Sequence, residues 1–122
     1  MTIRIAEFMD EEQTEAVVEI CDNGISLMAY SYPYMGLPLD GRITLDALLT
    51  KTIWLEQEQY APIKTDKGFF SYRLTAQVTD AKAQKVQIGD IAIYLDLPLP
   101  KDIPNGAFVS FDVMRLDVEF ES

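Results

Sequence analysis

The fold of this chain is decided by one stretch around an Asn-Gly pair: Glu15-Ala16-Val17-Val18-Glu19-Ile20-Cys21-Asp22-Asn23-Gly24-Ile25-Ser26-Leu27-Met28-Ala29-Tyr30. Asn and Gly both tolerate a positive φ, which a two-residue type I′ turn requires at its two central positions. With this turn, Asp22 pairs with Ile25, and the apolar residues fall on one face: Ala16, Val18, Ile20, Ile25, Leu27 and Ala29. The stretch therefore predicts a β-hairpin with one buried face.

Three later segments alternate apolar and polar residues with the period of a half-buried strand: residues 69–79, 91–97 and 107–120. Val86 and Ile88 have the opposite parity to Ile91, which predicts a turn at Gly89-Asp90. In the last segment the parity changes near Val113, so we expect a long strand with a bulge or sharp bend at that point.

Residues 43–58 fit two patterns. Leu45, Leu48, Leu49 and Ile53 have helical spacing, whereas Ile43, Leu45, Ala47 and Leu49 alternate as in a strand. We expect a short helix around 44–50 that leads into a strand around 52–59. For the whole chain of 122 residues we expect one β-rich domain, 1–122. The first-choice fold is mostly β, a small antiparallel OB-like β-barrel with at most one short helix, and the alternative is a two-sheet β-sandwich.

Composition excludes several kinds of chemistry. The chain has no histidine and one cysteine, which removes Ser-His-Asp and Cys-His catalysis, intrachain disulfides and Cys-rich or His-ligated metal centres. We expect no enzyme and no cofactor, with a carboxylate pair in a cleft as the alternative that remains open. No apolar run approaches the ~18 residues of a membrane span, and the acidic start does not suit a signal peptide, so we expect a soluble, cytoplasmic protein without membrane contact.

Acidic residues are concentrated in the first half of the chain. The sequence holds 20 acidic and 10 basic residues for a net charge of −10, and residues 1–61 carry 11 of the acids but only 3 of the bases. This balance disfavours nucleic acid and favours a basic partner. The densest acidic group is Asp10-Glu11-Glu12 together with Glu7, Glu15 and Glu19. We interpret it as a docking patch for a basic protein, and the alternative is a surface that only maintains solubility.

The second candidate partner-binding element is Tyr30-Ser31-Tyr32-Pro33-Tyr34-Met35-Gly36-Leu37-Pro38-Leu39. Tyr30, Tyr32 and Tyr34 are expected on the face opposite the apolar one, and Pro33 suggests an edge strand that runs into a loop. Tyrosine brings a large contact area at a small entropic cost, so the three rings suit a recognition surface. The alternative is that they cap one end of the domain. A homo-oligomer built through this edge is compatible with either interpretation.

Basic and aromatic residues are interleaved further along the chain: Lys64, Lys67, Phe69, Tyr72, Arg73, Lys82 and Lys85. On an OB-like barrel such a set binds single-stranded oligonucleotides through stacking and phosphate contacts. The alternative is a solvated hairpin whose cations balance nearby acids. The leading hypothesis is a non-enzymatic acidic domain that binds a basic protein, as an inhibitor or immunity-type protein or as an accessory subunit. Oligonucleotide binding is the second.

Overall fold

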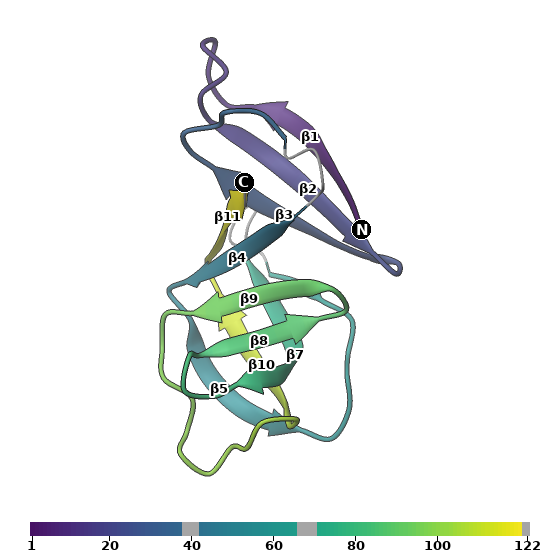
Figure 1. Cartoon of the computed structure of the whole chain (residues 1–122), viewed down its shortest axis with the longest axis vertical. Coiled ribbons are helices and arrows are strands. Elements are labelled where there is room, and N and C mark those ends of the chain that lie inside the picture. The colour runs from purple at the N-terminus through teal and green to yellow at the C-terminus, as the bar shows by residue number, and fades with distance from the viewer. Residues whose placement is uncertain (38–41, 66–70, 121–122) are drawn as a thin grey trace.

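The protein is built from one β-sheet of eleven strands, and the residues described, 1–37, 42–65 and 71–120, contain no helix (Figure 1). The structure is a computed structural model. The strands are β1 (Thr2–Phe8), β2 (Ala16–Asp22), β3 (Ile25–Ser31), β4 (Ile43–Leu48), β5 (Lys51–Glu56), β6 (Ile63–Lys64), β7 (Tyr72–Asp80), β8 (Lys85–Ile88), β9 (Ile91–Leu95), β10 (Phe108–Val113) and β11 (Arg115–Phe120). The expectation of a mostly β protein is confirmed.

The β2–β3 hairpin forms as the sequence predicts. Asp22 pairs with Ile25, and the pairing continues in register along both strands. Asn23 and Gly24 have φ values of 48° and 81°, which are the positive values of a type I′ turn. The predicted apolar face is buried, with only Ile25 partly exposed at the turn. Local turn chemistry and side-chain alternation were therefore sufficient to predict this element.

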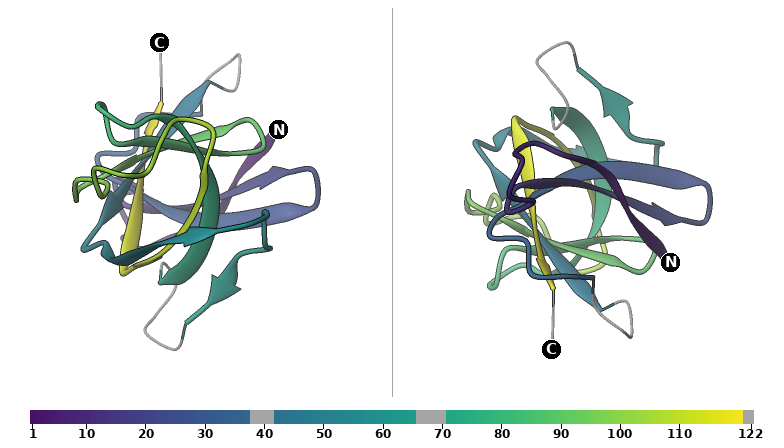
Figure 2. Two further views of the ribbon diagram at one scale, coloured as in Figure 1. Left: turned by 90° about the horizontal axis from the view of Figure 1, so that it is seen from below. Right: turned by 90° about the horizontal axis from the view of Figure 1, so that it is seen from above.

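The strand order differs from that of the expected closed or nearly closed antiparallel barrel. The order is β1-β2-β3-β11-β4-β9-β8-β7-β10-β5, with β6 beside β7, so the sheet is open and ends at β1 and β5. It is also mixed, because β11 runs parallel to β3 and β4 runs parallel to β9. Figure 2 shows that this single sheet curls around the long axis of the molecule. The alternating segments predict strands well, but their alternation says nothing of which strands become neighbours.

Two long segments bend together and divide the sheet into an upper and a lower part (Figure 1). β4 and β5 are separated only by Leu49 and Thr50, and β10 and β11 only by Met114. At the bend, the Met114 amide donates to the Leu48 carbonyl at 3.2 Å. The bend in the last strand was predicted from the change of parity near Val113. Met114 is the first residue after the change of parity, where the alternation predicts an inward side chain, but it is 37% exposed because the bend turns it outward.

The Asp96 carboxylate fixes the other side of this bend. It accepts hydrogen bonds from the Leu49 amide at 2.7 Å and the Thr50 amide at 3.1 Å. Burial by itself would raise the pKa of Asp96, but the hydrogen bonds from Thr50 and Leu49 outweigh it and lower the pKa. Leu49 adopts φ 56°, an unfavourable value for a branched side chain, so these bonds hold the backbone in a conformation it would otherwise avoid.

The expected helix at 44–50 is wrong. Residues 43–48 form β4, in which Ile43, Leu45 and Ala47 are buried. β4 is hydrogen-bonded on both edges, to β11 and to β9, and these pairings outweigh the helical spacing of its leucines. Leu97 was expected inside but is 38% exposed, because the chain leaves β9 after Leu95.

The core lies inside the curl and draws on the upper and lower parts alike. Its largest fully buried side chains include Phe111, Ile20, Leu27, Leu45 and Leu74. The predicted inward residues of β7, from Tyr72 to Val78, belong to this cluster. Phe70, which shares that predicted face, lies outside the described residues. Among the residues described, there is no helix with the length and apolar character needed to cross a membrane.

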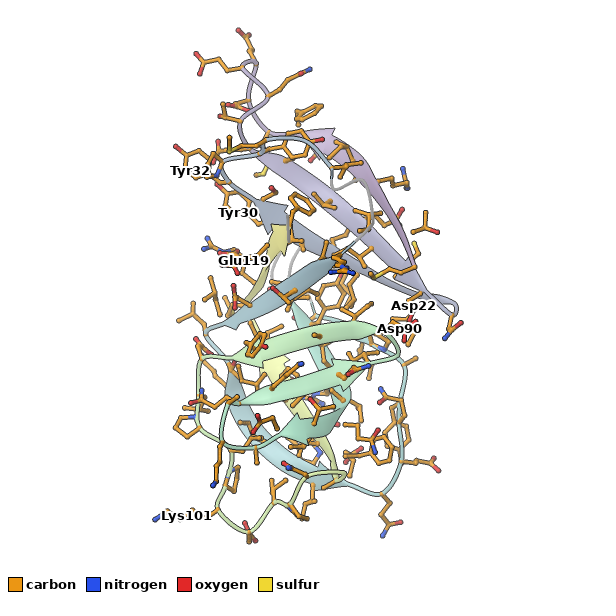
Figure 3. The ribbon with its side chains drawn as sticks, viewed as in Figure 1. Asp22, Tyr30, Tyr32, Asp90, Lys101 and Glu119 are labelled. Carbon is orange, nitrogen blue, oxygen red and sulfur yellow. The ribbon has the colours of Figure 1, made fainter. Side chains whose placement is uncertain are left out.

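A second tie joins the two parts at the turn of the β2–β3 hairpin. Asp22 is 7% exposed, and its Oδ2 accepts a hydrogen bond from the Asp90 amide at 2.8 Å. Asp22 and Asp90 lie side by side in Figure 3. Gly89, in the predicted turn, has φ 56°, and a Cβ there would clash with the same Asp22 oxygen. The turn therefore requires glycine for its backbone conformation and for the space beside Asp22.

We predict that Gly89→Ala destabilises the protein more than Gly24→Ala. Gly24 also has a positive φ but an open surrounding, so Gly24→Ala measures backbone strain alone, about 1–2 kcal/mol. Gly89→Ala additionally displaces the carboxylate that binds Asp90, which adds about 1–3 kcal/mol. Urea unfolding of both variants measures the difference. The excess should disappear when Gly89→Ala is made in an Asp22→Ala background, and equal losses in the two single variants would contradict the assignment.

Candidate interaction surface

The β1–β2 loop, residues 9–15, is held by Asp10. Its carboxylate accepts hydrogen bonds from the Thr14 amide at 2.9 Å, the Glu15 amide at 3.0 Å and the Thr14 hydroxyl. The Thr14 hydroxyl and the Glu15 amide lower the pKa of Asp10. Asp10, predicted as part of a docking patch, thus acts within its own loop. The exposed acidic side chains of the loop are Glu11 and Glu12.

The tyrosine segment packs directly against this loop. The Tyr34 amide donates to the Thr14 carbonyl at 2.7 Å. The Tyr34 ring lies edge-on to Phe8, with centroids 5.5 Å apart, and to Phe120 at 6.4 Å. Two candidates that the sequence offered separately, the acidic loop and the tyrosine segment, are therefore side by side.

The three tyrosines were predicted to lie on one face, and this prediction is wrong. Tyr34 turns inward and packs on the core, Tyr32 is 64% exposed, and Tyr30 is partly buried on the outer face of β3. The difference arises because the chain leaves β3 after Ser31, so strand alternation ends before Tyr32. Beyond Tyr34, Met35 is 88% exposed. The most exposed apolar side chains beside the acidic loop are thus Met35 and Tyr32, and Met9 in the loop and Leu37 further along the segment are also exposed.

Tyr30 belongs to a row of outward-facing residues that crosses several strands. Directly paired neighbours, which point to the same side of a sheet, run from Val17, which is covered on this face and buried, through Tyr30, Asp117, Asp46 and Tyr94 to Lys85. Glu7 pairs with Val17 and extends the row to β1. Glu119 lies two residues after Asp117 and so faces the same way. In Figure 3, Tyr32, Tyr30 and Glu119 lie along one side of the upper part.

Within this row, Tyr30 is surrounded by charged groups. Its hydroxyl donates to Glu15 Oε1 at 2.5 Å, and the Arg115 guanidinium lies 5.1 Å from its ring centroid. The hydrogen bond to Glu15 and partial burial raise the pKa of Tyr30 to about 12. Arg115 Nε is also 2.7 Å from Asp117 Oδ1. Glu15 and Tyr30, both predicted partner-binding residues, are therefore joined, with Arg115 as the neighbouring cation.

Asp46 carries an unfavourable charge in this row. Burial raises its pKa, and the neighbouring carboxylates of Glu119 and Asp117 raise it further. Sequence reasoning missed Asp46, Asp117 and Glu119 as surface acids because β4 and β11 are far apart along the chain. In the sequence, these acids alternate with apolar residues such as Leu45 and Leu116, which are buried, and this alternation predicts that the acids lie on the outer face of the sheet.

The basic and aromatic candidates are distributed over different contacts. Tyr72 is buried, and its hydroxyl accepts a hydrogen bond from the Met28 amide at 2.9 Å, while Lys64 lies over its ring. Arg73, on the opposite face of β7, binds Asp112, and Lys85 lies 5.9 Å from the ring centroid of Tyr94. Lys82 is exposed in the β7–β8 turn. Lys67 and Phe69 lie outside the described residues.

The protein has many carboxylates. Over residues 1–37, 42–65 and 71–120, however, no three or more Asp, Glu or Cys side chains lie close enough together to hold a metal ion. Asp10 and Asp96 accept backbone amides, and Asp117 pairs with Arg115. These acids therefore serve as loop caps and ion-pair partners. At the upper end of the molecule, charged and apolar side chains are exposed together.

We predict that Asp46→Asn stabilises the protein near neutral pH. The pKa of Asp46 is higher in the folded protein than in the unfolded chain, so the folded state binds more protons between the two values, and stability falls as the pH rises through this range. Removing the charge should add about 0.2–1 kcal/mol to the free energy of unfolding, as for like charges facing each other across strands.

Urea unfolding at several pH values measures this effect. The gain from Asp46→Asn should shrink as the pH falls below the ordinary pKa of aspartate, because the wild-type carboxyl is then neutral in both states. Asp102→Asn, at an exposed position, is the matched control for loss of one negative charge. A gain that is the same at all pH values, or that equals the control, would refute the electrostatic explanation.

Comparison of this chain with protein-family models, curated proteins and solved structures finds no match.

Proposed function

We propose that this protein is a non-enzymatic interaction domain that binds a basic protein partner through the β1–β2 loop and the segment from Tyr32 to Leu37. The single observation that supports the proposal is the hydrogen bond from the Tyr34 amide to the Thr14 carbonyl, at 2.7 Å. It holds the exposed carboxylates of Glu11 and Glu12 next to exposed apolar side chains. Charged groups beside an apolar anchor are the usual composition of a protein-binding surface.

Charge supports the choice of a basic partner. Residues 1–61 contain 11 acidic and 3 basic residues, and the acidic loop projects from the upper end of the molecule (Figure 1). Such a field attracts a positively charged protein before contact and increases the association rate. The outer row adds Asp46, Asp117 and Glu119 below the loop, compensated by Arg115. Burial and then the neighbouring carboxylates raise the pKa of Asp46, and a cation from the partner would offset the part that comes from these carboxylates.

Exposed apolar side chains beside the loop support a stable contact with the partner. Met35 and Tyr32 are 88% and 64% exposed, more than the other large apolar side chains in the described residues. Methionine adapts to irregular surfaces, and tyrosine contributes a rigid ring with a polar tip. An inhibitor or immunity-type protein that covers a basic surface would use this combination, as would an accessory subunit of a larger assembly.

We predict that the loop carboxylates determine capture of the partner. Immobilised protein should retain basic proteins from a lysate of the source cells at ~50 mM salt and release them at several hundred millimolar, because screening weakens charge attraction. The double variant Glu11→Gln/Glu12→Gln should retain several-fold less. Glu58→Gln/Asp102→Asn, which removes two exposed charges elsewhere, is the matched control.

Calorimetric titration of the purified partner at several ionic strengths then gives the affinity. Tyr32→Ser/Met35→Ser should weaken binding at every salt concentration, whereas the Glu11/Glu12 variant should weaken it mainly at low salt. An acidic partner, or an affinity that ignores both the loop charges and the salt concentration, would overturn the proposal. A single-stranded oligonucleotide that competes for binding would favour the second hypothesis instead.

A further inference from the structure

A hollow of about 300 Å³ lies on the outer face of the lower part, between β5, β10, β7 and the segment that follows β5. It is distant from the acidic loop, which lies at the other end of the molecule (Figure 1). The side chains that matter for its chemistry are Trp54, Glu56, Tyr60, Arg73, Thr75 and Ser110. No part of the proposed protein-binding function uses these residues.

The floor of the hollow is made of two small hydroxyl residues between larger walls. Ser110 on β10 pairs with Trp54 on β5 and with Thr75 on β7, so the three side chains form one row across the sheet. Ser110 and Thr75 are 2% and 3% exposed, and their hydroxyl oxygens are 2.7 Å apart. Short side chains at these two positions leave the space that Trp54, Tyr60 and Ile63 surround.

The Thr75 and Ser110 hydroxyls can form more hydrogen bonds than the one between them. Each hydroxyl carries one proton and two acceptor sites, and the bond between them uses one of the two protons. In the described residues, the side chains of Thr75 and Ser110 make no other hydrogen bond. One O–H donor of the pair is therefore left for a group that enters the hollow.

One cationic and one anionic side chain lie at the ends of the hollow, and each has an atom that is still able to form a hydrogen bond. Trp54 Nε1 donates to Glu56 Oε1 at 2.8 Å, which leaves Glu56 Oε2 as an acceptor. Arg73 uses Nε and Nη2 for Asp112, at 2.9 and 3.3 Å, so its Nη1 remains a donor. The Arg73 guanidinium also lies 5.2 Å from the centroid of the Trp54 ring. The hollow thus presents donors and an acceptor between aromatic walls, with nearly balanced charge.

We propose that this hollow binds a neutral saccharide unit. A sugar ring has an apolar C–H surface that packs on an aromatic side chain, and hydroxyl groups that both donate and accept hydrogen bonds at its rim. These requirements match the Trp54 and Tyr60 walls, the Thr75 and Ser110 floor and the polar ends at Arg73 and Glu56. The indole N–H is already bound to Glu56, so Trp54 offers the sugar its ring and not a hydrogen-bond donor.

Trp54 makes the proposal directly measurable, because it is the only tryptophan of the chain. Its fluorescence is titrated with glucose, galactose, mannose, xylose and N-acetylglucosamine and with their disaccharides, and nucleosides form a separate arm. We expect a saturable change with at least one saccharide. The variant Thr75→Val/Ser110→Ala should raise the dissociation constant of the saccharide about fivefold or more. Glu56→Gln should also raise it.

Two controls separate binding from folding and from the proposed protein-binding function. Thr75→Val/Ser110→Ala replaces both partners of a buried hydrogen bond with apolar groups of similar shape, so its unfolding midpoint should stay close to that of the wild type. Glu11→Gln/Glu12→Gln should leave saccharide binding unchanged. The proposal is overturned if no saccharide gives a saturable change, if the hydroxyl variant binds as the wild type does, or if only nucleosides respond.

Discussion

The bend shared by β4–β5 and β10–β11 is the constraint on which both ends of the molecule depend. Asp96 holds Leu49 and Thr50 by their amides, and Met114 closes the other side through the Leu48 carbonyl. Above the bend, β11 is free to pair with β3, which positions the hairpin and its acidic loop. Below it, β10 pairs with β5 and β7 and creates the outer face that carries the hollow. One local distortion therefore lets a single sheet present two different surfaces.

The elements that follow from neighbouring residues could be predicted from the sequence. The Asn23-Gly24 turn fixes the register of β2 and β3, and the alternation around Leu74 and Ile93 correctly gives their buried faces. Residues 44–50 could not be assigned in this way, because helix and strand periodicities overlap there. Hydrogen bonding on both edges of β4 decides in favour of a strand, and those partners come from distant parts of the chain.

The candidate surface was predicted in composition but not in arrangement. The acidic loop and the tyrosine segment were identified separately, and the Thr14–Tyr34 hydrogen bond that joins them depends on how the chain folds back after β3. Asp10 and Tyr34 have structural roles that composition does not reveal, as a loop cap and as a ring packed on Phe8. Asp46 and Asp117 become neighbours only through long-range pairing, so no local pattern brings them together.

The contact between Asp22 and the Asp90 amide has a mechanical consequence for the upper part. The hairpin is braced at its turn by this contact and near its other end by the pairing of Tyr30 with Asp117. Because these two contacts lie at separate points of the hairpin, together they restrict its rotation relative to the lower part. A force on the acidic loop is therefore transmitted to the lower strands, and the hairpin does not move as an independent unit.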